Sequence, residues 1–152
     1  MGADARITEL GLELPEPQSP VANYVSAVGA GDLLFLAGHG PLSADGKIVL
    51  GKVGSDLDVA AGAEAARLCG LGLLAAMRAE LGSLDRVVRI VKLLVMVNCA
   101  PGFNDTPAVA NGCSDLMVEV FGDAGRHARS AVGMAELPFD IAVEIEAVVQ
   151  VG

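Results

Sequence analysis

The chain has 152 residues, which is enough for one domain with a single hydrophobic core. Hydrophobic residues make up 53% of it and the mean hydropathy is +0.54, much of which comes from small residues, including 19 glycines. The formal net charge of −9 repels phosphate backbones and aromatic stacking platforms are scarce, so the composition opposes nucleic acid as the main partner. An apolar excess in so short a chain indicates burial beyond the monomer, and hence a homo-oligomer.

Targeting, membrane and metal signals are weak. No uninterrupted apolar run reaches the roughly 18 residues that a membrane helix needs, because charged residues interrupt the apolar stretch 60–81. The first twenty residues lack the apolar centre of a signal peptide. Three cysteines without CxxC spacing predict reduced thiols in a cytoplasm, and two histidines in distant segments do not predict a metal site. A cysteine–histidine nucleophile pair stays open, with Cys99 as the plausible reactive thiol.

The first half of the chain predicts strands and one long helix. Residues 1–20 form an N-terminal extension, in which a short amphipathic segment precedes three prolines. Strands are then expected at Tyr24–Val28 and Leu33–Ala37 around a glycine turn, and a third short strand at Lys47–Leu50 follows an Asp-Gly hairpin turn. Asp58 is expected to cap a helix that ends at Gly82, where glycine permits a left-handed stop.

The second half predicts a buried strand, a helix and two final strands. The nearly continuous apolar run Val87–Val97 is typical of a central strand. Thr106 is expected to cap a second helix that ends at Gly122, and strands follow at about Arg129–Glu136 and Ile141–Val151. The order β-β-β-α-β-α-β-β predicts an α+β domain over residues 1–152, with two helices on one face of a mixed sheet. The other face would need another copy of the chain to cover it.

The last two strands hold the most informative charges. Arg129 opens the first of them, and a guanidinium in an apolar sheet needs an anionic partner, either an internal glutamate across the expected hairpin or the carboxylate of a ligand. Glu144 and Glu146 share one face of the second strand, where each raises the proton affinity of the other.

The motif Ala-Arg-Ser-Ala-Val at 128–132, Leu137-Pro138, and Val-Glu-Ile-Glu-Ala at 143–147 resembles the RidA/YjgF family of enamine/imine deaminases, which is also catalogued as endoribonuclease L-PSP-like. The resemblance covers roughly residues 20–151. It implies a chorismate-mutase-like fold of the bacillus type in a homotrimer, with three sheets around a central barrel and ligand clefts between subunits.

The resemblance also implies roles for particular residues. Arg129 would grip the carboxylate of a 2-imino acid with two parallel hydrogen bonds, and Glu144 would be the functional acid. The Ala131 backbone N–H would help to hold that carboxylate, although many members carry cysteine at this position. His127 likewise stands where relatives often have proline.

Four further residues fall at or near positions that are characteristic of the family. Tyr24 would line the pocket with a ring that has a polar tip. Gly38 would let the backbone approach a ligand, and the neighbouring His39 would donate to it. Asn111, unfavourable inside a helix, would hold a loop through its amide. Two of them also have a purely structural explanation, since Tyr24 fits a half-buried residue of an edge strand and a lone histidine such as His39 is more often structural or at the surface.

Three functions follow. The first is a cofactor-free hydrolase that converts small enamine or imine acids of the 2-aminoacrylate/2-iminopropanoate type into 2-oxo acids and ammonia. The second is a trimer that binds or senses small carboxylates without turnover. The third is an endoribonuclease or translation inhibitor, which the acidic charge of the chain opposes.

Overall fold

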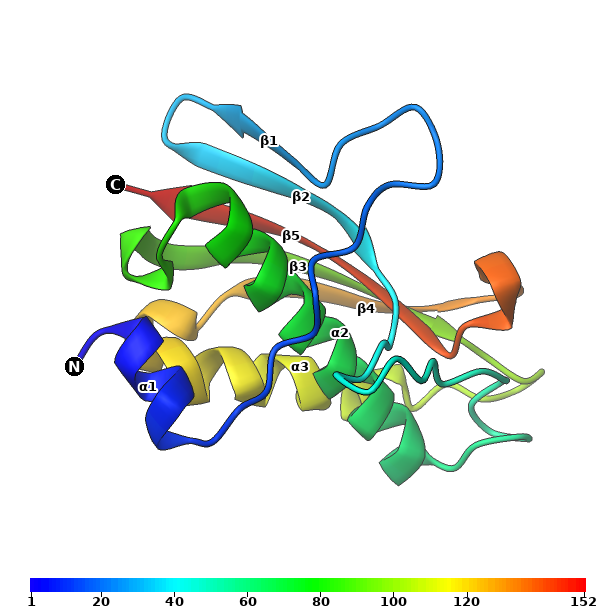
Figure 1. The fold of residues 1–152 in the computed structure, drawn as a ribbon. Coiled ribbons are helices and arrows are strands. Elements are labelled where there is room, and N and C mark those ends of the chain that lie inside the picture. Colours follow the sequence, from blue (N-terminus) through cyan, green and yellow to red (C-terminus); the bar gives the residue numbers. More distant parts are fainter.

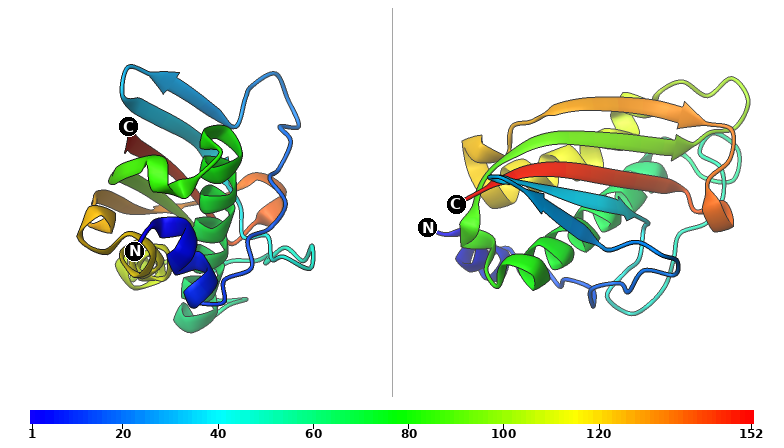
Figure 2. Two further views of the ribbon diagram at one scale, coloured as in Figure 1. Left: turned by 60° about the vertical axis from the view of Figure 1, so that its left-hand side comes forward. Right: turned by 90° about the horizontal axis from the view of Figure 1, so that it is seen from above.

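The computed structural model describes all residues from 1 to 152 and contains one five-stranded mixed sheet with helices on one of its faces (Figures 1 and 2). The strands are β1 (Ala27–Ala30), β2 (Leu33–His39), β3 (Val87–Asn98), β4 (Ala128–Met134) and β5 (Val143–Val151), in the spatial order β1-β2-β5-β3-β4. The helices are α1 (Ala3–Glu9), α2 (Val59–Leu81) and α3 (Thr106–Phe121). The predicted α+β class is confirmed.

Helix α2 begins and ends where the sequence predicts. The Asp58 carboxylate accepts a hydrogen bond of 2.8 Å from the Ala61 backbone N–H, and Gly82 ends the helix at a φ of +81°. In length and composition α2 does qualify as a membrane span, contrary to the sequence-based expectation. Half of its most apolar window is nevertheless buried inside the domain, as in the core helix of a globular protein.

The core lies between the sheet and the pair α2–α3. Alternate residues of β3 and β5 point into it, and both helices contribute an apolar stripe. The helices approach closely because α3 has Gly112 at the crossing, where a Cβ atom would lie 1.8 Å from the Ala63 carbonyl oxygen. Their separation therefore depends on one missing methyl group.

Strands β4 and β5 do not form the hairpin that the sequence suggested. Strand β3 lies between them, paired in parallel with β4 and antiparallel with β5 (Figure 2). The physical reason is the crossover through α3, which returns the chain to β3 as a β-α-β unit and so places β4 at the edge of the sheet. Arg129 therefore has no glutamate opposite it on a neighbouring strand, since its partner in the register is Leu93.

Three local predictions are wrong. The segment 47–50 forms only isolated bridges, Leu42↔Ile48 and Leu50↔Ile141, because Pro41 has no N–H with which to extend the ladder. Tyr24 precedes β1 and lies in a loop. Thr106 is the first helical residue of α3 and does not cap it, since its hydroxyl donates instead to the Ala131 carbonyl oxygen at 2.9 Å.

The sheet face opposite the helices is open (Figure 2). Side chains of paired residues form rows across the strands on this face, and one row consists of Val28, Phe35 and Val148. Val28 and Phe35 are exposed, as are Val88 and Val132 on β3 and β4. Charged and polar side chains, Lys92 among them, interrupt this apolar surface.

Candidate functional site

Arg129 lies against α3 and makes three hydrogen bonds within its own protomer. Its Nη1 donates to the Asn111 Oδ1 and to the Ser114 Oγ, both at 2.9 Å, and its Nη2 donates to the Pro107 carbonyl oxygen at 3.3 Å. Asn111 and Ser114 are three residues apart on α3 and so present their side chains on one helix face. We call Arg129, Asn111, Ser114 and the Pro107 carbonyl the arginine site.

The arginine site holds a positive charge that the protomer does not neutralise. All three acceptors are uncharged, and Arg129 takes part in none of the five ion pairs of the chain. A guanidinium has five N–H donors, of which these bonds use two on Nη1 and one on Nη2. The Nε–H and one Nη2–H remain, and two such donors match the two oxygens of a carboxylate.

Ala131 lies two residues beyond Arg129 on the same face of β4, and the Thr106 hydroxyl donates to its carbonyl oxygen.

The three cysteine thiols are poor candidates for nucleophiles. Burial raises the pKa of the Cys99 thiol, raises that of Cys113 to about 12, and raises that of Cys69 well above its usual range. All three thiols are held protonated at neutral pH, so the cysteine–histidine nucleophile pair finds no support.

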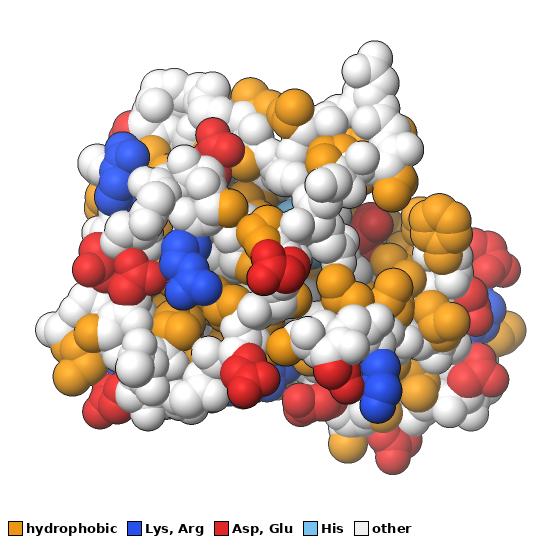
Figure 3. All heavy atoms as spheres, in the orientation of Figure 1, with side chains coloured by type: hydrophobic (Ala, Val, Ile, Leu, Met, Phe, Trp, Pro, Cys, Tyr) orange, Lys and Arg blue, Asp and Glu red, His pale blue; other side chains and the backbone are white.

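A second site lies where β2 ends and β5 begins, at a cleft of about 370 Å³ beside Tyr24. We call it the Tyr24 cleft. Hydrophobic side chains gather at that end of the molecule, near the loop 18–26 and the turn 138–140 (Figure 3). Its lining brings together four of the residues named by the sequence: Tyr24, Gly38, His39 and Glu144.

Glu144 enters the Tyr24 cleft because Gly38 leaves room for it. A Cβ atom at Gly38 would lie 2.9 Å from the Glu144 Cδ and 3.0 Å from its Oε2. Burial raises the pKa of Glu144, and the nearby Glu146 carboxylate raises it further. The register of β5 on β3 confirms that the two glutamates share one face, and Glu144, the carboxyl group in the cleft, is the one whose pKa is raised.

His39 is almost fully buried, with 4% of its surface exposed, and packs against Gly72 of α2. Its Nδ1 lies 2.7 Å from the Ala37 carbonyl oxygen, and a carbonyl only accepts, so Nδ1 carries the hydrogen. Burial lowers the pKa of His39, and the bond to Ala37 offsets this in part. The neutral imidazole therefore has its lone pair on Nε2, which is an acceptor and not the donor that the sequence suggested.

A strained turn forms one wall of the Tyr24 cleft. Phe139 and Asp140 have φ angles of +58° and +60°, in the left-handed region that residues other than glycine rarely adopt. The fully buried Asn98 anchors the turn, because its Nδ2 donates to the Asp140 Oδ1 at 3.0 Å and its Oδ1 accepts from the Lys52 Nζ at 2.9 Å. The turn presents Phe139 to solvent with 84% of its surface exposed.

The arginine site and the Tyr24 cleft do not meet within one protomer. Arg129 is in register with Leu93 and Ala147, whose side chains are buried on the helix face. Glu144 is in register with Met96, and Met96 with Val132, on the open face. The two charged residues therefore lie on opposite faces of the sheet, on strands that β3 separates.

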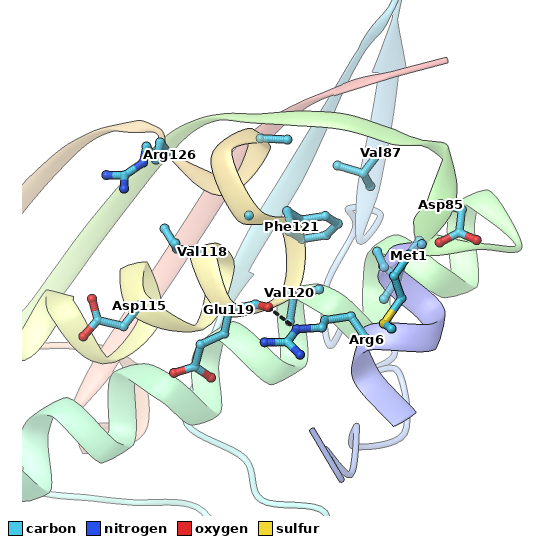
Figure 4. A pocket seen from close by; sticks show the side chains of 15 residues that line it. Met1, Arg6, Asp85, Val87, Asp115, Val118, Glu119, Val120, Phe121 and Arg126 are labelled. Atoms are coloured by element: carbon cyan, nitrogen blue, oxygen red, sulfur yellow. Dashed lines mark hydrogen bonds between the residues drawn. The ribbon is translucent and has the colours of Figure 1, made fainter. Parts of the chain in front are cut away.

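The chain has a larger hollow, but it contains none of these residues. It is an open trough of about 930 Å³ between α1, the end of α3 and the start of β3 (Figure 4). Arg6, which lines the trough, already has partners within the chain. Its Nε donates to the Glu119 carbonyl oxygen at 2.9 Å, and its Nη1 forms an ion pair with Glu9. The other arginine of the trough, Arg126, is paired with Asp123, so the trough offers no free cation and we do not regard it as the functional site.

Sequence reasoning missed several residues of both sites. Ser114 was detectable, because it follows Asn111 by one helical turn and breaks the apolar pattern of α3. Phe139 and the segment 18–21 line the Tyr24 cleft through tertiary contacts that no local pattern encodes. The carbonyl oxygen of Pro107 joins the arginine site through its backbone alone.

Comparison with known proteins agrees with this architecture. The family described as "YjgF/chorismate mutase-like, putative endoribonuclease" matches residues 4–145. Protein TCP17 of Trypanosoma cruzi is 48% identical over 147 residues, which cover 96% of this chain and 92% of that protein.

Two crystal structures are also similar. One is a protein of unknown function from Agrobacterium tumefaciens, which is 42% identical with a TM-score of 0.91, over 99% of this chain and 92% of that one. The other is Escherichia coli TdcF with bound serine, which is 27% identical with a TM-score of 0.61, over 91% and 94% of the two chains. On the extent of the family match and of the identity to TCP17, the chain belongs to the YjgF/chorismate mutase-like family.

Proposed function

We propose that this protein hydrolyses small 2-imino acids, formed from 2-aminoacrylate-type enamines, to 2-oxo acids and ammonia. The site would combine the arginine site of one protomer with the Tyr24 cleft of a neighbouring copy in a homotrimer. The observation that carries the proposal is the unneutralised Arg129, whose two remaining N–H donors suit a carboxylate. The structure of TdcF with bound serine, itself a carboxylate ligand, supports it by likeness.

The need for a second copy is argued from the faces of the sheet. Arg129 and Glu144 point to opposite faces and are too far apart in the register to share a small ligand. The open face exposes apolar side chains that another sheet would cover. Packing that face against a neighbour would bring an edge strand of one copy toward the cleft of the next, and a head-to-tail contact of this kind forms a ring when its rotation closes after three copies.

The chemistry would use one anchor and one acid. Arg129, with the Ala131 N–H, would hold the substrate carboxylate and so orient the C=N bond. Glu144, whose pKa burial raises, would give a proton to the imine nitrogen while water adds to C2, and would then accept a proton from the added oxygen. Glu144 would next give that proton to the amine nitrogen and, as the C–N bond breaks, take up the proton of the remaining hydroxyl group, so ammonia and the 2-oxo acid leave with Glu144 restored.

The test is ammonia release from enzymatically generated 2-iminopropanoate. Wild-type protein should exceed the rate in buffer, and Arg129→Ala should abolish the excess. Arg126→Ala is the matched control, because this exposed arginine lies three residues away and is paired with Asp123. A wild-type rate equal to that in buffer would refute the hydrolase, and light scattering would test the trimer.

The second candidate is a trimer that binds small carboxylates without turnover, and the serine bound to TdcF favours it. The same arginine site would serve. Pyruvate or serine should then raise the melting temperature of wild-type protein but not of Arg129→Ala, with no ammonia released. The family description also carries an endoribonuclease activity, against which the net charge of −9 argues. RNA cleavage by nuclease-free protein that is lost in Arg129→Ala would revive that function.

A further inference from the structure

Arg129 stands at the start of a chain of hydrogen bonds that passes through two side chains and ends on the backbone. Its Nη1 donates to the Ser114 Oγ at 2.9 Å, the Ser114 Oγ lies 2.9 Å from the His127 Nε2, and the His127 Nδ1 lies 2.6 Å from the Gly125 carbonyl oxygen. Neither Ser114 nor His127 contacts the Tyr24 cleft.

The direction of each bond in this chain is fixed by chemistry. The Gly125 carbonyl can only accept, so when the imidazole of His127 carries one hydrogen, that hydrogen is on Nδ1 and Nε2 is an acceptor. The guanidinium can only donate, so the Ser114 oxygen accepts from Arg129. The single hydroxyl hydrogen of Ser114 is then directed at Nε2 of His127. Every donor points the same way, and each bond polarises the next.

The end of the chain is rigid. Gly125 packs directly on the last turns of α3, where a Cβ atom would lie 2.1 Å from the Met117 carbonyl oxygen. This close approach holds the Gly125 carbonyl, and therefore the imidazole ring of His127, in one place. The other end is held by α3 itself, which carries Ser114.

We propose that Ser114 and His127 are positioning residues that hold the Arg129 guanidinium in the orientation that presents Nε–H and one Nη2–H to the carboxylate of the substrate. This inference rests on the proposed function. Without Ser114, the guanidinium would keep one bond of 2.9 Å to Asn111 and the longer bond of 3.3 Å to the Pro107 carbonyl oxygen, whereas a second bond of 2.9 Å on Nη1 holds its plane more firmly. Ser114 is a good second acceptor because His127 takes its only hydrogen.

The test compares Ser114→Ala, His127→Leu and the double variant with wild type. Pyruvate affinity is measured by calorimetry, and KM and kcat are measured with 2-iminopropanoate. Each single variant should weaken pyruvate binding and raise KM by about tenfold, with kcat within about twofold of wild type, because a carboxylate anchor contributes uniform binding. The double variant should be no worse than either single one, because both remove the same chain of bonds.

The conservative variant His127→Gln separates positioning from a general loss of structure. The Gln side-chain oxygen can accept from Ser114 in place of Nε2, so this variant should recover most of the pyruvate affinity that His127→Leu loses. A merely structural role would lower kcat through a smaller active fraction and leave KM unchanged.

Two failures are distinguishable. If wild-type protein neither binds pyruvate nor turns over the imine, the proposed function is wrong, and the positioning role falls with it. If wild type binds pyruvate, but the Ser114→Ala and His127→Leu variants bind it within twofold of wild type, the proposed function stands and the positioning role is refuted.

Discussion

The α2–α3 crossing predicts a sharp difference between two glycine-to-alanine substitutions. In the middle of a helix, alanine is favoured over glycine by about 1 kcal/mol. At Gly112 the new methyl group would lie 1.8 Å from the Ala63 carbonyl oxygen, and reaching an ordinary contact of 3.4 Å requires the helices to separate by about 1.6 Å. Backbone cannot swing aside as a side chain can. Overpacking typically destabilises by about 1–3 kcal/mol, and this geometry belongs at or above the upper end.

We therefore expect Gly112→Ala to lower the free energy of unfolding by about 2 kcal/mol or more. Gly72→Ala on α2 is the matched control, because its Cβ would lie 3.4 Å from the His39 Cδ2, an ordinary contact, so this variant should be unchanged or more stable by up to about 1 kcal/mol. Urea unfolding followed by circular dichroism at one fixed protein concentration measures both. A Gly112→Ala protein as stable as wild type, beside the expected Gly72→Ala result, would refute the reasoning.

Three further predictions concern the Tyr24 cleft. The pKa of Glu144 is raised in the folded protein, so the native state binds more protons than the unfolded state, and the free energy of unfolding falls as pH rises above the ordinary pKa of 4.5. Urea unfolding should therefore show Glu144→Gln to be more stable than wild type at pH 7 but not at pH 4. Asn98→Ala should lose about 1–3 kcal/mol of stability, measured in the same way, because it leaves Asp140 and Lys52 without their buried partner. Phe139→Gly should keep or gain up to about 1 kcal/mol of stability, because it relieves the positive φ at little loss of packing, yet weaken pyruvate binding in calorimetry; a clear loss of stability would contradict this explanation.

The elements were predictable where the signal is local. Asp58 and Gly82 mark the ends of α2 through capping chemistry that involves only a few neighbouring residues. The apolar run of β3 and the alternation in β5 likewise identify strands without reference to the rest of the chain. These signals name the strands but say nothing about which strands pair.

Pairing was the part that the sequence could not give. The short Pro-containing connection after β4 is typical of a hairpin, yet β3 occupies the place between β4 and β5. The consequence reaches the site directly. A hairpin would have placed the strand of Glu144 and Glu146 next to that of Arg129, whereas at the sheet edge Arg129 meets only the uncharged groups of α3. The choice between an internal ion pair and a free cation was therefore decided by topology.

The energetically unfavourable features of this fold lie at the arginine site and the Tyr24 cleft. Arg129 keeps an unneutralised charge, Glu144 keeps a carboxyl group whose ionised form burial disfavours, and Phe139 keeps a left-handed backbone conformation. The burial of Glu144 and the backbone conformation of Phe139 disfavour the isolated protomer, and such features persist where the surrounding structure over-determines them. A cation on one face and a carboxyl group of raised pKa on the other can act on one small ligand only when two copies meet. Under the proposed function, dilution that dissociates the oligomer should therefore abolish turnover while the fold of each protomer survives.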